Sequence, residues 1–162
     1  NANCFGPTVL YPWMPASALI ATHLKTSLPT PWCQSGIDTF NIGSSSYLVV
    51  SSYADTENGS RFVDSFLFRL GLAHNATHGN FGDDFLLLDN PHTPGQGAAV
   101  LLQSFPTRSA VSVKHFVVGQ SRFVVFASAE EDEPTRVYSA NANSNPPHFI
   151  HHQDLETHRA TS

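Results

Sequence analysis

Apolar and polar positions follow the same order in two stretches of this chain. In each stretch, two apolar runs rich in β-branched and aromatic residues flank a glycine and polar residues: residues 40–50 (FNIGSSSYLVV) and residues 116–126 (FVVGQSRFVVF). This order predicts a β-hairpin in each, with Gly43 and Gly119 at a turn that needs a residue tolerant of positive φ. The continuous apolar run after each turn is typical of a strand covered on both faces. Two copies indicate an internal repeat, with chance similarity between hairpins as the alternative.

Further strands are expected on the C-terminal side of each hairpin. A third strand is predicted at residues 64–69 and 135–139, and a fourth at residues 98–104 and 148–154. No stretch keeps a helical period between a cap and a stop over the length that a helix needs. Four short antiparallel strands per unit, repeated at about 50 residues, are typical of a β-propeller blade.

The residues that flank the hairpins extend the repeat and suggest its boundaries. Thr26, Gln103 and Gln153 take equivalent places in a Gln(or Thr)-x-apolar-x-Thr pattern, so the first unit carries about 27 extra residues. We expect a single all-β repeat region over residues 1–162. Its parts would be the end of a preceding blade at 1–30, a blade at 31–104 with a long insertion near 71–97, a second blade at 107–154, and the start of a further unit at 155–162.

Composition and charge narrow the class of protein. Only 13% of the residues are charged, and the net charge of −5 with eight Lys and Arg argues against a nucleic-acid partner. Apolar runs are too short to predict a membrane span. Because the sequence begins at Asn1 without an initiator Met, we expect a processed mature chain or an excised piece. The polar, lysine-poor composition suits a secreted all-β module.

Two cysteines and two sequons point to an extracellular or cell-surface location. A Cys4–Cys33 disulfide would close a loop of about 30 residues, which the chain-entropy model values at roughly 3–4 kcal/mol. Two independent thiols, one of them paired outside this chain, are the alternative. Glycosylation is predicted at Asn58 and Asn75, which begin Asn-Gly-Ser and Asn-Ala-Thr sequons in loop-like surroundings.

The repeated motifs resemble those of a known family. They are residues 10–13 (LYPW), 103–110 (QSFPTRSA), 40–43 with 47–50 (FNIG and YLVV), and 116–119 with 123–127 (FVVG and FVVFA). The pattern is similar to the epilepsy-associated (EAR or EPTP) repeat, as in the secreted leucine-rich glioma-inactivated proteins. The resemblance implies antiparallel four-stranded blades of a β-propeller that mediates extracellular protein–protein contacts.

The number of units departs from the family's pattern. Family members carry more repeats, which close into a propeller, whereas this chain holds two full units and fragments of others. We therefore expect a partial propeller. Three explanations remain open: a piece of a larger propeller, a subunit completed by other copies, or a different all-β fold that mimics the repeat.

The long insertion contains the strongest candidates for partner binding. An apolar run in this otherwise loop-like segment is too hydrophobic for a free loop, so we expect it to face a partner. The residues concerned are Phe81, Phe85, Leu86, Leu87 and Leu88. Alternatively, the run is itself the fourth strand, followed by a surface excursion.

Signals for catalysis, cofactors and metals are weak. The sequence has no Gly-x-Ser-x-Gly elbow, no phosphate-binding glycine loop and no His-Glu-x-x-His, so we expect neither an enzyme nor a cofactor. His148, His151 and His152 form the densest histidine group, but at most two can share one face of a strand, which makes a poor zinc site. The acidic run at residues 130–133 is expected to be a solvated loop.

These observations favour a binding role. We expect an extracellular protein–protein interaction module that binds another glycoprotein, so that its partner is an extracellular protein or further copies of the chain itself. One alternative is a structural subunit that polymerises through open strand edges into a fibre or sheath. Another is a lectin-like carbohydrate-binding β protein that uses Tyr11, Trp13 and Trp32 as stacking platforms.

Overall fold

The described part of this 162-residue chain consists of strands and their connections. The computed structural model describes residues 9–10, 13–14, 19–20, 26–27, 32–55, 59–72 and 97–157, and side chains within 33–55, 59–70 and 99–157. Four two-residue strands come first and pair antiparallel as β1 with β4 and β2 with β3: β1 (Val9–Leu10), β2 (Trp13–Met14), β3 (Leu19–Ile20) and β4 (Thr26–Ser27).

Two four-stranded antiparallel sheets make up the rest. The first sheet has the order β5-β6-β7-β8, with β5 (Trp32–Ile42), β6 (Ser45–Asp55), β7 (Phe62–Leu72) and β8 (Gly97–Arg108). The second has the order β12-β11-β10-β9, with β9 (Ala110–Val118), β10 (Ser121–Ser128), β11 (Thr135–Asn141) and β12 (Ile150–Leu155). The predicted all-β class with four-stranded antiparallel sheets is confirmed, and both sheets are consistent with propeller-like blades.

Each sheet begins with one of the two predicted hairpins. The turns between β5 and β6 and between β9 and β10 carry Gly43 at φ 57° and Gly119 at φ 60°, where glycine adopts the left-handed conformation without a steric penalty. The register between the second and third strands is also the same in the two sheets. Val49 lies opposite Leu67, and at the same place in the second sheet Val125 lies opposite Val137.

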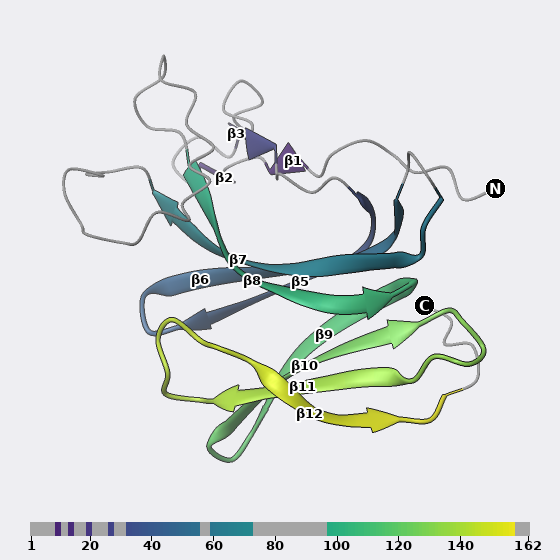
Figure 1. Ribbon diagram of the computed structural model, residues 1–162. Helices are drawn as coiled ribbons and strands as arrows, with labels where there is room; N and C mark the ends of the chain where they lie inside the picture. Colours follow the sequence, from purple (N-terminus) through teal and green to yellow (C-terminus); the bar gives the residue numbers. More distant parts are fainter. Residues whose placement is uncertain are drawn as a thin grey trace.

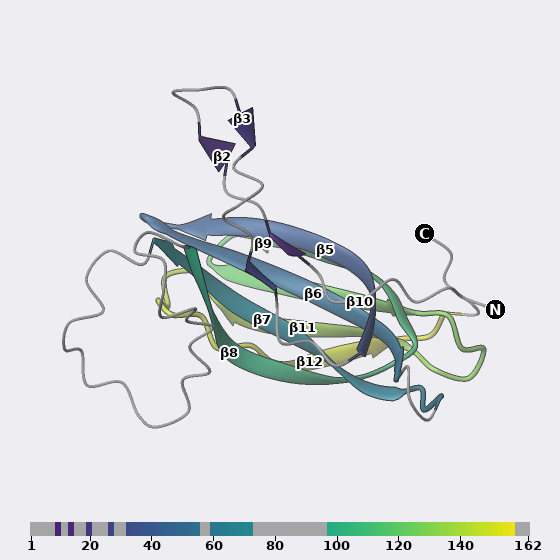
Figure 2. The same cartoon turned by 90° about the horizontal axis from the view of Figure 1, so that it is seen from above.

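The two sheets lie face to face as two layers (Figure 1), and one covers the other when they are seen from above (Figure 2). Between them is an aromatic and aliphatic core, here called the inter-sheet core, to which strands of both sheets contribute. Its members include Phe40, Tyr47, Val49, Leu67, Phe105, Val113, Val124, Phe126, Tyr138 and Phe149. Association of the sheets therefore rests on apolar burial across this layer.

The apolar runs after the two turns differ in how they are covered. Residues 47–50 are buried on both faces of the first sheet, because a second apolar cluster that includes Leu48, Val50, Phe66 and Phe68 is also buried on the face away from the second sheet. In the second sheet, Val124 and Phe126 are buried in the inter-sheet core, whereas Phe123 and Val125 face away from it and are partly exposed. The prediction that both faces of the strand are covered is therefore wrong for the second run.

Candidate interaction surface

The face of the second sheet that points away from the inter-sheet core is apolar and exposed. Side chains alternate along a strand and directly paired residues share a face, so this outer face is set by the register of β9 to β12. Its apolar members are Phe116, Val118, Phe123, Val125, Val137, Ile150 and Leu155. Phe116 is 43% exposed, Val118 and Ile150 are each 62% exposed, and Leu155 is 42% exposed.

Aromatic contacts organise the centre of this outer face. The ring of Phe116 stacks on that of Phe123 with centroids 5.3 Å apart, and His152 meets Phe123 edge-on at 5.4 Å. Among the described residues that face this side, Lys114 carries the only full charge, and its side chain is 73% exposed. The face thus offers an apolar patch with a cation at its rim, which is typical of a surface that packs against another protein.

Two polar contacts hold the sheets together at the edges of the inter-sheet core. The side-chain amide of Gln103 in β8 donates to the carbonyl of Phe149 (2.6 Å) and accepts from its backbone N–H (2.9 Å). The Asp38 carboxylate in β5 accepts from the backbone N–H of His115 (2.8 Å) and pairs with Lys114 at 3.4 Å. Burial opposes ionisation of Asp38, but these hydrogen bonds outweigh it and lower the pKa of Asp38.

His115 lies at the same contact between the sheets. Its ring stacks on Phe40 with centroids 3.9 Å apart, and its Nε2 lies 3.3 Å from Arg122 Nη1. Burial, and then the positive charge of Arg122, hold the pKa of His115 below its ordinary value against the opposing attraction of Asp38. Protonation of His115 is therefore unfavourable in the folded protein.

This arrangement predicts that stability falls in mild acid. The unfolded chain takes up a proton on this histidine near pH 6.5, whereas the folded chain resists it, so the free energy of unfolding should be highest above that pH and decrease as the pH falls below it. Denaturant unfolding between about pH 7.5 and 5.5 measures this slope. The variant His115→Phe keeps the ring and should flatten it, and His152→Phe, on the outer face, is the control. An unchanged slope in His115→Phe would contradict the prediction.

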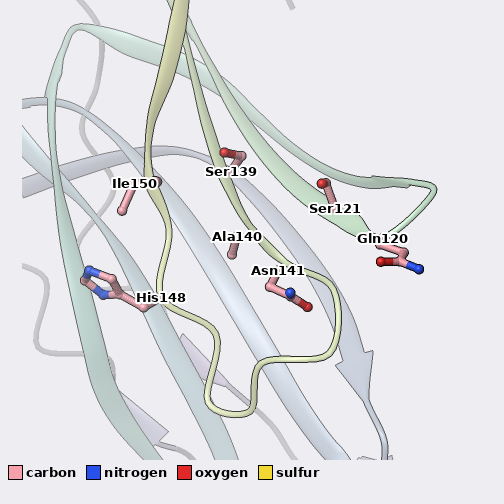
Figure 3. A pocket seen from close by; sticks show the side chains of 7 residues that line it. All are labelled: Gln120, Ser121, Ser139, Ala140, Asn141, His148 and Ile150. Atoms are coloured by element: carbon pink, nitrogen blue, oxygen red, sulfur yellow. The ribbon is translucent and has the colours of Figure 1, made fainter.

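A shallow pocket of about 390 Å³ lies at the end of the second sheet, beside the outer face. Figure 3 shows Gln120 and His148 on opposite sides of it, with Ser121, Ser139 and Asn141 between them. The lining carries amide and hydroxyl groups and no carboxylate. Such groups can bind neutral polar groups through hydrogen bonds, and the imidazole of His148 adds a further donor or acceptor.

The comparison with known families identifies part of the chain. Residues 100–139 match the family model of the EPTP domain. Residues 100–139 are therefore similar to an EPTP domain. This EPTP match runs from β8 into β11, so it includes the last strand of the first sheet and the first three strands of the second. A search of curated proteins found no match.

The EPTP match bears on the class of function. EPTP domains are protein-interaction repeats of extracellular proteins and are not an enzyme family. Within the described ranges, no helix has the length and apolar character to cross a lipid bilayer. The same part of the chain contains no group of three or more His, Cys, Asp or Glu residues that could hold a metal ion.

Several residues singled out in the sequence lie outside the part of the chain that the structure describes. They are Cys4, Asn58, Asn75, Phe81, Phe85, Leu86, Leu87 and Leu88, together with Tyr11 and the side chains of Trp13 and Trp32. Cys33 is buried in β5. The disulfide, both glycosylation sites and the partner-binding role of the insertion therefore remain predictions.

The three C-terminal histidines lie apart from one another. The ring of His151 packs edge-on against Tyr138 of the inter-sheet core and its Nε2 lies 2.8 Å from Asp154, whereas His152 lies on the outer face and His148 lines the pocket. Each therefore has a separate environment.

The acidic run at residues 130–133 is a turn in which Glu131 and Asp132 are exposed, as expected for a solvated loop, whereas its two end residues form ion pairs. Glu130 pairs with Arg61 and Glu133 pairs with Arg108, so this loop of the second sheet is tied to arginines of the first. Sequence reasoning missed these pairs because the arginines lie far away along the chain. It also missed the outer face as a surface, because its residues follow the same pattern as the buried residues of the first unit.

Proposed function

We propose that this chain is an extracellular interaction module of the EAR type that binds another glycoprotein through the outer face of β9 to β12. The exposure of Phe116, Val118, Ile150 and Leu155 on one preformed sheet face carries this proposal. Covering such a patch removes apolar surface from water, which is the main favourable term in protein association. A patch spread over the face of a sheet suits a protein layer better than a small ligand, which needs a concave site.

The adjoining pocket supports a glycoprotein as the class of partner. Its amide and hydroxyl groups, from Gln120, Asn141, Ser121 and Ser139, match the hydroxyl groups of a neutral glycan in hydrogen-bonding character. A partner seated on the apolar face would bring its surface sugars next to this pocket. Protein contact would then supply most of the affinity, and the pocket would add selectivity.

The division of the chain belongs to this proposal as well. We propose two blades at residues 31–104 and 107–154, preceded by the end of another blade at 1–30 and followed by the start of a further unit at 155–162. The location that fits a module of this kind is the extracellular space or the cell surface. The outer face of β9 to β12 belongs to the second of these blades, so this blade would bind the partner.

Phe116→Asp tests the proposed surface. We expect it to weaken binding to partner ectodomains at least tenfold, because a carboxylate would be desolvated at the centre of the interface. The measurement is binding of the chain to an array of recombinant extracellular glycoproteins by surface plasmon resonance. Phe62→Asp is the matched control, since Phe62 is 69% exposed and lies on the first sheet. Equal binding by the two variants would refute the proposed surface.

A second candidate function rests on strand β12. Within the described residues β12 pairs only with β11, and each of its six residues is exposed, so its other edge can accept a further strand. This favours a structural subunit that polymerises through open edges. Sedimentation over a range of concentrations separates the two roles: a stable 17.6 kDa monomer excludes polymerisation, and growing species support it.

A further inference from the structure

The pocket at the end of the second sheet is held in shape from two sides. On one side, the carbonyl of Gln120 in the β9–β10 turn accepts from the backbone N–H of Ala142 (2.8 Å). On the other side, His148 precedes Phe149, whose main-chain N–H and carbonyl are both held by Gln103. The walls of the pocket are therefore positioned by contacts within the protein, which lowers the cost of ordering them when a ligand binds.

The polar groups of the lining come from two neighbouring strands and from the turn beside them. Ser121 of β10 lies directly opposite Asn141 of β11, and Ser139 of β11 shares their face. The side-chain oxygen of Asn141 accepts from the backbone N–H of Asn143 (2.9 Å), which orients this amide. Among the described residues, neither the Ser121 hydroxyl nor the Gln120 side-chain amide has a hydrogen-bond partner, so both can bond to a ligand.

Aromatic rings border these polar groups on the same face of the sheet. Phe123 lies directly opposite Ser139, and Phe116 stacks on Phe123 from the next strand. Ile150, which also lines the pocket, lies on the other side of Ser139. One row across the sheet thus presents two aromatic rings, a hydroxyl and an aliphatic side chain. A ligand seated here would meet apolar surface and hydrogen-bonding groups side by side.

The charge of the lining limits the class of ligand. Amide, hydroxyl and imidazole groups line the pocket, and no carboxylate, lysine or arginine does so. An ion placed here would lose water without gaining an ion pair, so a neutral ligand is favoured. An extended peptide is disfavoured as well, because β11 is paired with β10 and β12 and offers it no free edge. A pyranose meets both requirements, since it has an apolar C–H face and neutral hydroxyl groups.

We propose that this pocket binds one neutral pyranose residue of a glycan, with the sugar hydroxyls on the amides and hydroxyls of the lining and the C–H face of the ring against Phe123. The volume of about 390 Å³ lies within the roughly 300–1,000 Å³ typical of small-molecule sites. This inference rests on the proposed function, in which the partner is a glycoprotein, and it specifies the chemical group of that partner that the pocket recognises. A sialic acid at the same place would bring a carboxylate that the lining does not pair.

An array of free N-glycans tests the pocket with the full chain. The array displays neutral glycans that end in galactose, N-acetylglucosamine or mannose, together with glycans capped by sialic acid or sulfate, all without protein. We expect the best neutral glycan to bind several-fold more strongly than any acidic one, because the lining offers no ion pair. Binding of no neutral glycan, or strongest binding of an acidic one, would overturn the inference.

Variants of the lining locate the sugar. Ser121→Ala combined with Ser139→Ala removes two hydroxyls and should weaken binding of the best neutral glycan about tenfold. Thr39→Ala, which removes an exposed hydroxyl of the first sheet, is the matched control. Phe123→Leu keeps an apolar side chain but removes the ring, so it should weaken binding several-fold relative to Phe62→Leu. Circular dichroism checks that each variant is folded. Binding by the double variant equal to that of Thr39→Ala would overturn the site, and unchanged binding by Phe123→Leu would overturn the contact with the ring.

Gln120→Arg tests the preference for neutral sugars by a gain of binding. A cation in the lining should raise binding of a sialylated glycan several-fold relative to its neutral counterpart. An unchanged ratio would show that the lining does not set the preference, contrary to the inference.

Free glycans also separate this inference from the proposed function. Glycoproteins that bind equally well after enzymatic removal of their glycans, while no free glycan binds, would overturn the sugar site and leave the apolar interaction surface standing. Binding of free neutral glycans, with no effect of Phe116→Asp on glycoprotein binding, would overturn the surface and support the sugar site.

Discussion

Phe105→Ala is expected to lower the free energy of unfolding by about 3–5 kcal/mol, the typical cost of removing a buried aromatic ring. Phe105 is 0% exposed in the inter-sheet core. Its ring centroid lies 5.0 Å from that of Phe126, 4.9 Å from Tyr138 and 6.2 Å from Phe149, and all three belong to the second sheet or its connections. The change would leave a cavity between the two sheets and remove the aromatic contacts that join them.

Urea unfolding followed by circular dichroism measures this loss. Since a loss of this size is a large part of the stability of a typical domain, Phe105→Leu provides a milder variant that should still fold. Phe62→Ala, at an exposed position, is the matched control and should cost less than about 1 kcal/mol. A loss below about 1 kcal/mol for Phe105→Ala would mean that the inter-sheet core does not carry the stability of the fold.

Gly36→Val is expected to cost about 1–3 kcal/mol or more, the range typical of overpacking. A Cβ at Gly36 would lie 2.8 Å from Ser51 Oγ, 3.2 Å from Ser112 Cα and 3.3 Å from Val113 N. The last two are backbone atoms of β9, so they can move aside only if the second sheet shifts. The absence of a side chain at this position therefore sets how closely β5 and β9 approach.

Two further variants distinguish a clash between the sheets from an effect within strand β5 alone. Thr39→Val, exposed in the same strand, is the control and should lie within about 0.5 kcal/mol of the natural protein. Adding Ser51→Ala to Gly36→Val should recover only part of the loss, since the contacts with Ser112 and Val113 remain. Full recovery, or a loss no larger than that of the control, would contradict the close approach of the sheets.

Local patterns predicted much of the fold because they report short-range physics. The β-hairpins around Gly43 and Gly119 and the strands that follow them are in the structure, although the third strand of the first sheet runs over Phe62–Leu72 rather than residues 64–69. The apolar run at residues 123–126 shows the limit of such patterns. It has the composition of residues 47–50, but one of its faces is not covered by the described residues, and composition does not say which neighbour is present.

Contacts between distant residues were beyond the sequence patterns. The pairs of Glu130 with Arg61 and of Gln103 with Phe149 join residues far apart in the chain, and their geometry depends on how one sheet lies over the other. The same holds for the low pKa of His115, which comes from its burial and from Arg122 at the contact between the sheets. The predicted partner-binding residues of the insertion lie outside the described part, so the candidate surface came from the tertiary structure instead.

The all-β class, the repeated hairpin with its turn glycines and the likeness to the EPTP repeat could be predicted from the sequence, because periodicity and turn chemistry are encoded within short segments. Which apolar face is buried and which is exposed depends on the packing of the two sheets, so it could not be predicted from the sequence pattern. Phe40 and Phe116 occupy equivalent positions, yet the first is 7% exposed and the second 43%. The physical reason is that an apolar pattern specifies a face that gains from burial, whereas its actual burial depends on whether another layer packs against it.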